Sequence, residues 1–168
     1  MRRILDPFGI AATFCMAMAL MCSHAVYAQE PPKDYVAFKA VAKVKYDAAV
    51  SYTIPGVQPR VDVSRFVGPG DGSPIGAFTL TEVDREYYGV DGVYLFYEAT
   101  GVLAAVNGDV LIYKGVGLGD PDKAGFIITG GSGRFRGATG SGFYTYKALN
   151  ADETEFENTY DGFVSVPK

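Results

Sequence analysis

The acidic and aromatic residues around position 98 are the first candidates for chemistry. Glu98 lies in the segment VYLFYEATGVL, at positions 93–103. If this segment is a regular strand, Glu98 shares a face with Tyr94, Phe96 and Thr100, because side chains alternate between the two faces. Burial among aromatic rings disfavours the charged form of a carboxylic acid, so such a residue could donate a proton. The favoured alternative is that this face looks outward and that Glu98 is solvated.

Three further side chains could contact a ligand. Tyr113 could present its phenol to a pocket, although stacking between aromatic residues on neighbouring strands is the more usual role. Arg134 and Arg136 flank Phe135 in a glycine-rich turn. They could clamp the carboxylate of a ligand at the mouth of a barrel, or they could simply be exposed. The sequence thus nominates Glu98 as a catalytic acid, and Tyr94, Phe96, Tyr113, Arg134 and Arg136 as ligand-binding residues.

The N-terminal segment has the features of a signal peptide. Arg2 and Arg3 precede an uncharged apolar run, and small residues stand at Val26 and Ala28. We therefore expect cleavage after Ala28, export to the periplasm or the medium by the general or the twin-arginine route, and one mature domain over residues 29–168. The apolar run is shorter than the roughly 20 residues of a membrane-spanning helix, and no second such run follows. No membrane span is expected in the mature chain.

Cleavage at this place would remove both cysteines and the single histidine, Cys15, Cys22 and His24. A chain without these residues forms no disulfide, no catalytic triad with histidine and no zinc or copper site of the usual ligand types. We therefore expect no metal and no cofactor, and any catalysis would use carboxylates, phenols, amines, hydroxyls or water. The net charge of −4, from 15 basic and 19 acidic residues, disfavours nucleic acid as a partner.

Alternation of apolar and polar residues with period two dominates the chain and predicts strands. Asn107-Gly108 is a dipeptide typical of a tight hairpin between two of them. No intervening segment has the length and helical spacing of the crossover helices that a parallel sheet requires. The pattern therefore predicts an all-β antiparallel barrel or sandwich. The expected strands begin near Val36, Arg60, Phe78, Val93, Val110, Phe126, Phe143 and Glu155.

The glycine-rich segment GGSGRFRGATGSG, at 130–142, invites a comparison with nucleotide-binding loops. A dinucleotide fingerprint needs G-x-G-x-x-G at the start of a helix. Here the third glycine, Gly137, comes one residue late, and Gly140 and Gly142 would weaken a helix. The phosphate-loop pattern of Gly-Lys-Ser or Gly-Lys-Thr is also missing. We therefore interpret these glycines as points where strands of a small barrel bend.

The longer segment FIITGGSGRFRGATGSG, at 126–142, resembles the signature of the allene oxide cyclase and dirigent-like barrels, and most closely that of their small secreted bacterial members. The segments IGAFT (75–79), ATGVLAAVNGDVL (99–111) and TYDGFVSV (159–166) are similar to other recurring segments of that family. The resemblance implies a closed barrel of roughly eight antiparallel strands, often oligomeric in the plant relatives, whose lumen holds a small apolar molecule. Plant members guide cyclisation or radical coupling mainly by shaping the substrate. Their catalytic residues lie in segments that do not align with this chain, so none is carried over.

Three functions follow as expectations, and the sequence leaves open whether the protein is an enzyme. The first is a secreted barrel that binds a small hydrophobic or aromatic molecule in its lumen, and the resemblance allows it to be a homo-oligomer. The second is a cyclase or isomerase without metal or cofactor, with Glu98 or a tyrosine assisting. The third is a structural protein whose lumen is filled by the 12 tyrosines and 11 phenylalanines of the chain. A membrane-embedded barrel is disfavoured because Glu155, Glu157 and Asp161 occupy alternate positions of one strand.

Overall fold

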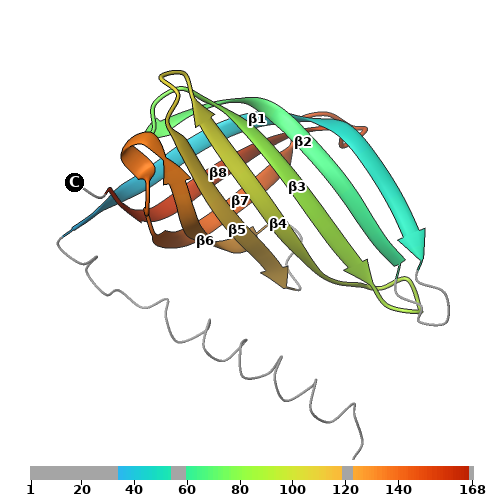
Figure 1. Ribbon diagram of the computed structural model, residues 1–168. Coiled ribbons are helices and arrows are strands. Elements are labelled where there is room, and N and C mark those ends of the chain that lie inside the picture. The colour runs from blue at the N-terminus through green and yellow to red at the C-terminus, as the bar shows by residue number, and fades with distance from the viewer. Residues whose placement is uncertain (1–33, 54–59, 119–122, 167–168) are drawn as a thin grey trace, which may run out of the picture. The chain divides into compact units, whose positions relative to one another are not determined.

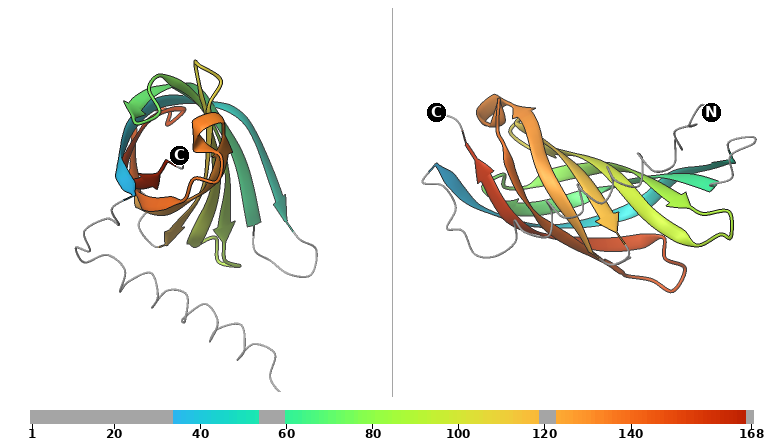
Figure 2. Two further views of the ribbon diagram at one scale, coloured as in Figure 1. Left: turned by 60° about the vertical axis from the view of Figure 1, so that its left-hand side comes forward. Right: turned by 90° about the horizontal axis from the view of Figure 1, so that it is seen from below.

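Eight antiparallel strands form a closed barrel in the computed structural model, which describes residues 34–53, 60–118 and 123–166 (Figure 1). Each strand pairs with the next one along the chain, and β8 pairs with β1 to close the ring that Figure 2 shows. The predicted all-β, eight-stranded antiparallel barrel is confirmed. The predicted signal peptide, residues 1–28, lies outside the described residues. The strands are β1 (Tyr35–Thr53), β2 (Arg60–Ser73), β3 (Phe78–Tyr88), β4 (Tyr94–Ala105), β5 (Val110–Leu118), β6 (Lys123–Ser132), β7 (Gly140–Ala148) and β8 (Glu155–Ser165).

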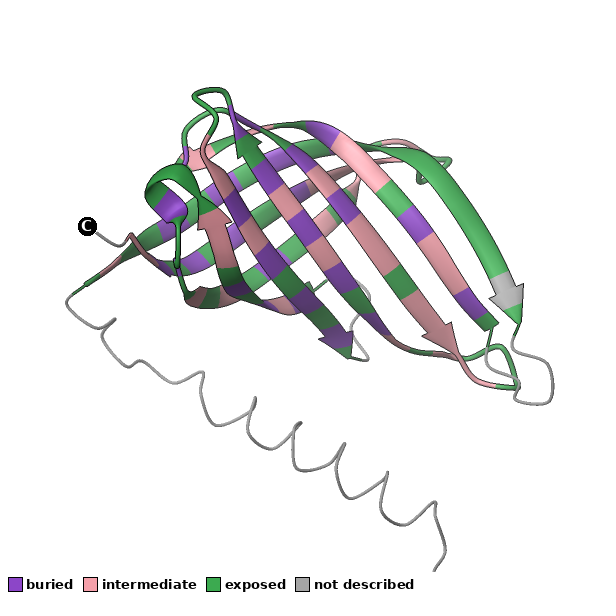
Figure 3. Ribbon diagram, in the orientation of Figure 1, coloured by how far each residue is buried: buried purple, intermediate pink, exposed green. Residues whose placement is uncertain are grey.

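The alternation in the sequence translates into an inner and an outer face on each strand. On β1, Phe38, Ala40, Ala42 and Val44 are buried, and the residues between them are exposed. The same alternation recurs on β5, where residues 111, 113, 115 and 117 are buried. Figure 3 shows it as bands of buried and exposed residues along the strands. Because side chains of a strand point to opposite faces in turn, the buried half of each pattern fills the barrel.

The glycine-rich segment connects β6 to β7 and contains the three-residue 3-10 helix Gly133–Phe135. Gly130 has φ +145°, at the point where the pairing of β5 with β6 shifts register between Ile112 and Tyr113. Such a shift, a β-bulge, bends a strand, and glycine tolerates the positive φ that it needs here. Phe135 is fully buried and covers this end of the barrel. Within the described ranges, no helix has the length and apolar character needed to cross a membrane.

Aromatic rings fill the middle of the barrel. We call Phe38, Tyr113, Phe126, Tyr144 and Tyr160 the aromatic plug, and all five side chains are buried. Phe126 lies 5.8 Å from Phe38 and 6.0 Å from Tyr160, measured between ring centroids. The ring of Tyr113 lies directly against Gly101 of β4, where any side chain would overlap it. Free space lies beside the plug, on the side of the barrel where β3 ends.

Candidate ligand-binding site

Three carboxyl groups on β3 point into the barrel. Glu82, Asp84 and Glu86 continue the inner face that begins with the buried residues Phe78 and Leu80. The Cα atoms of neighbouring members of this acidic row are roughly 6.5 Å apart, since a strand rises about 3.3 Å per residue. Extending the period-two pattern from Phe78 would have placed these acids inside the barrel. Sequence analysis missed them because charged side chains on a half-buried strand normally face water.

A cavity of about 70 Å³ lies beside the acidic row, and we call it the acidic cavity. A second hollow of about 250 Å³, which we call the mouth, shares Phe66, Glu86 and Phe156 with it. None of the described residues that line either space is basic. Together they form an acidic, partly aromatic recess at one end of the barrel. The acidic cavity is lined by Val44, Phe66, Glu82, Asp84, Glu86, Tyr97, Tyr146, Phe156 and Asn158, and the mouth adds Tyr46, Ala49, Ser51, Asp62, Ser64 and Glu153.

Glu82 joins the acidic cavity to the aromatic plug. Its carboxyl group is buried and accepts hydrogen bonds from the hydroxyl of Tyr113 and from Nδ2 of Asn158, the latter at 3.3 Å. The Tyr113 hydroxyl also lies 2.8 Å from the hydroxyl of Tyr160. Burial raises the pKa of Glu82 from its usual value near 4.5 to about 8, against the lowering effect of its hydrogen bonds. At neutral pH this carboxyl group is therefore mainly protonated.

Asp84 has an oxygen atom without a partner. Its Oδ1 is shut off from solvent and forms no hydrogen bond within the described part of the chain. Burial, and then the charges of Glu82 and Glu86, raise the pKa of Asp84 well above its usual range. A buried polar atom without a hydrogen bond costs about 1–3 kcal/mol of stability. Local departures of this kind are concentrated at functional sites.

Tyrosines and one arginine flank the mouth. The hydroxyl of Tyr88 donates to Oε2 of Glu86 at 2.7 Å, and burial raises the pKa of Tyr88 to about 12. The guanidinium of Arg60 lies 4.0 Å from the centre of the Tyr88 ring, and its Nε lies 3.0 Å from Oδ2 of Asp62. Tyr94, a predicted ligand-binding residue, packs against Tyr88 with 5.9 Å between ring centroids. Of the residues nominated from the sequence, Tyr94 thus lies beside this recess.

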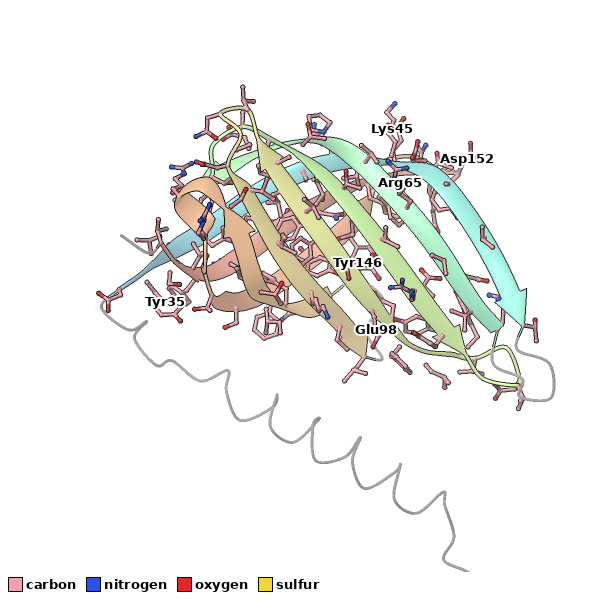
Figure 4. All side chains as sticks on the ribbon, viewed as in Figure 1. Tyr35, Lys45, Arg65, Glu98, Tyr146 and Asp152 are labelled. Carbon is pink, nitrogen blue, oxygen red and sulfur yellow. The ribbon has the colours of Figure 1, made fainter. Side chains whose placement is uncertain are left out.

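Glu98 and Phe96 lie on the outer face of β4. Glu98 is exposed and accepts a hydrogen bond from the hydroxyl of Tyr87 at 3.3 Å, while Phe96 stacks on the Tyr87 ring at 4.4 Å. The pairing of β3 with β4 shifts register between Tyr87 and Tyr88, which separates the face of Phe96 from that of Tyr94. The solvated arrangement that the sequence allowed for Glu98 is the one observed. Figure 4 labels Glu98 on β4 and Tyr146, from β7, behind the front strands.

The other nominated residues lie apart from the acidic cavity. Tyr113 belongs to the aromatic plug and reaches the cavity only through its bond to Glu82. Arg134 closes the opposite end of the barrel, where its Nε lies 2.8 Å from Oδ2 of Asp109 and its Nη2 donates to the carbonyl oxygen of Ile75 at 2.8 Å. Arg136 is exposed near the same end. The structure therefore does not bring the two arginines together with Tyr94 and Glu98.

No family model matches this sequence, and no curated protein is significantly similar to it. Among solved structures, the chain is similar to the pterocarpan synthase dirigent protein GePTS1, with a TM-score of 0.52 and 16% sequence identity, over 85% of this chain and 99% of that chain. A second pterocarpan synthase dirigent protein, PsPTS1, has a TM-score of 0.48 and 14% identity, over 84% and 99% of the two chains. At these identities the likeness shows the fold alone. The predicted resemblance is thus confirmed at the level of architecture: this chain has a dirigent-like barrel.

Proposed function

We propose that the protein is a secreted barrel that binds a small aromatic molecule in the acidic cavity and the mouth. One observation carries the proposal. The recess combines aromatic walls with a buried carboxyl group, Asp84, whose Oδ1 has no hydrogen-bond partner among the described residues. The dirigent-like barrel supports it at the level of fold. Export after cleavage at Ala28 and self-association belong to the same proposal, and rest on the sequence and on its resemblance.

The aromatic side chains that line the recess can pack against an aromatic ring of a ligand. Phe66 and Phe156 meet edge to face with 5.6 Å between ring centroids, and Tyr146 lies 6.3 Å from Phe156. A ligand ring among them gains about 25 cal/mol for each Å² of apolar surface removed from water, and each aromatic contact adds about 0.5–1.5 kcal/mol. A polar group on the ligand would supply the hydrogen bond that Asp84 lacks. The filled-barrel alternative applies to the plug and leaves the recess unexplained.

Phe156→Ala is expected to weaken the binding of phenol, used as a probe, about tenfold, because one aromatic wall is lost. Binding would be followed by chemical-shift changes of the recess residues during titration. Phe163→Ala is the matched control, since Phe163 lies on the outer face of the same strand. It is expected to leave the phenol affinity unchanged. Failure of phenol to saturate any site, or equal losses in the two variants, would contradict the proposal.

A second function, acid-assisted cyclisation or isomerisation, is favoured by the protonated acids in the recess. Burial raises the pKa of Glu82 to about 8 and that of Asp84 well above its usual range, which favours the protonated form of both acids. Either acid could donate a proton to a leaving hydroxyl or to a carbonyl oxygen of an enclosed substrate. In this proposal Glu82 or Asp84, and not Glu98, is the catalytic acid, because Glu98 faces away from the recess.

Turnover separates the enzyme from the binding protein. A molecule that co-purifies from the native source would be incubated with the wild type and with Asp84→Asn, and its conversion followed by mass spectrometry. An enzyme is expected to lose about a hundredfold or more of its rate in the variant, the typical contribution of general acid catalysis. Glu98→Gln is expected to convert the molecule at the wild-type rate. Equal rates for Asp84→Asn and the wild type would contradict acid catalysis by Asp84.

A further inference from the structure

The recess is lined by acidic groups without a basic partner. Its lining includes Glu82, Asp84 and Glu86 in the acidic cavity and adds Asp62 and Glu153 in the mouth, and no basic residue is among the described residues that line it. Arg60, which flanks the mouth, is already engaged with Asp62 and with the Tyr88 ring. Burying carboxyl groups without cationic partners costs stability. The imbalance therefore points to a cation that the bound ligand itself provides.

Hydrogen-bond acceptors without a partner in the recess also indicate a cationic ligand. Asp84 and Asp62 each have an Oδ1 atom that is shut off from solvent and lacks a partner within the described ranges. When ionised, these oxygen atoms only accept hydrogen bonds, so the complementary group on a ligand is a donor. The neighbouring rings of Phe66 and Phe156 present faces that attract a cation.

We propose that the ligand of the acidic cavity is an organic amine, bound as its ammonium ion. An N–H group of the ammonium donates to Oδ1 of Asp84, and the hydrocarbon part packs against Phe66 and Phe156. This inference rests on the proposed binding function and names the ligand class for the same site. It disfavours anions such as fatty acids, because the described lining offers acidic groups and no cation to pair with a carboxylate.

A metal ion would be a poor substitute for the ammonium. Calcium and magnesium need several oxygen ligands within about 2.0–2.6 Å of the ion. The Cα atoms of neighbouring acids are roughly 6.5 Å apart along β3. In the part of the chain that the structure describes, no three histidine, cysteine, aspartate or glutamate side chains are placed to hold a metal. An amine needs only one carboxylate and an apolar wall.

Proton balance gives the proposal a measurable signature. The empty recess holds protonated acids, and the ammonium ion requires a carboxylate, so binding releases about one proton to the solvent. The proton comes from an acid of β3, since burial raises the pKa of Glu82 to about 8 and that of Asp84 well above its usual range. Affinity for a cation therefore rises with pH over the range in which the acids of the empty recess are protonated, by up to about tenfold per unit. The titratable or charged groups that face these acids are Arg60 and Asp62 on β2, Glu86 and Tyr88 on β3, Tyr94 and Tyr97 on β4, Tyr113 on β5, Tyr144 and Tyr146 on β7, and Tyr160 on β8.

Calorimetry with two matched probes tests the inference. Benzylammonium and benzyl alcohol have the same ring, and only the first carries a charge and an N–H group. At about pH 8 we expect benzylammonium to bind at least tenfold more tightly. Its affinity should rise from about pH 5 to pH 8, and its binding heat should vary with the ionisation heat of the buffer. Benzyl alcohol should show neither dependence. Benzyl alcohol that binds as tightly as benzylammonium, or an affinity of benzylammonium that is independent of pH, would overturn the inference and leave the binding function standing.

Two variants locate the effect. Asp84→Asn keeps the shape of the side chain and removes its charge, so benzylammonium should lose its advantage over benzyl alcohol and its proton release should fall. Glu98→Gln removes a carboxylate from the outer face and should behave as the wild type. An unchanged preference in Asp84→Asn would overturn the assignment to Asp84, and the wild-type pH dependence decides the matter should that variant fail to fold. If neither probe binds to the wild type at any pH, both this inference and the binding function are wrong.

Discussion

Between about pH 5 and pH 8, the free energy of unfolding is expected to fall by on the order of 4 kcal/mol as the pH rises. The folded chain raises the pKa of Glu82 from near 4.5 to about 8, so in this window the folded state binds a proton that the unfolded state has lost. The stability is fully present below about pH 4.5 and is lost as the pH rises through about 8. The raised pKa of Asp84 acts in the same direction. Paired surface carboxylates usually give the opposite trend, because their folded pKa is lowered.

Urea unfolding at a series of pH values measures this effect. Glu82→Gln cannot titrate and is expected to flatten the dependence, whereas Glu98→Gln is expected to retain the wild-type slope. Histidine contributes nothing from within the described barrel, because His24 is the single histidine of the sequence. A wild-type stability that is constant or rising over this window would show that Glu82 is ionised in the folded protein.

Phe126→Ala is expected to cost about 3–5 kcal/mol of stability, the typical result of removing a ring from a packed core. Phe126 is buried and meets Tyr113 at 5.9 Å and Tyr160 at 6.0 Å between ring centroids. These neighbours are held by hydrogen bonds to each other and to Glu82, so they collapse poorly into the space that the ring leaves. Chemical denaturation followed by circular dichroism provides the measurement.

Phe143→Ala is the control for this substitution. Phe143 lies on the paired strand β7, but it points outward and is 36% exposed. Its loss is expected to cost less than about 1 kcal/mol, because little apolar surface is returned to water. Similar losses in the two variants would mean that the plug does not stabilise the barrel.

The architecture was predictable because period-two alternation is a local property of the sequence. The run from Phe38 to Val44 shows on its own which residues face inward, because lysines alternate with its buried apolar residues. The run from Leu111 to Gly117 shows the alternation but not the inner face, since its outer face also carries the apolar residue Val116. The turn at Asn107-Gly108 was also predictable from local sequence. In the structure Gly108 has φ +88°, and the amide of Ala105 donates to the carbonyl oxygen of Asp109 at 2.8 Å. The connection between β4 and β5 spans residues 106–109, more than the dipeptide alone.

The candidate site was harder to predict, because its position depends on pairing between strands. Around Glu98 both faces of β4 carry aromatic residues, so local alternation does not decide which one is inside. The register shift between Tyr87 and Tyr88 then turns Tyr94 inward and Phe96 outward. The acidic row was missed for a different reason. Glu82 and Asp84 break the rule that charged residues face water, and that rule outweighed the alternation from Phe78 that places them inside the barrel.

The aromatic plug closes the barrel behind the recess. Tyr113 and Phe126 block passage along the barrel axis, and Phe135 covers the far end. Phe66, Glu86 and Phe156 line both the acidic cavity and the mouth, so a molecule that passes from one space to the other contacts them. A bound molecule would keep a second one out of the acidic cavity until it has passed these three residues.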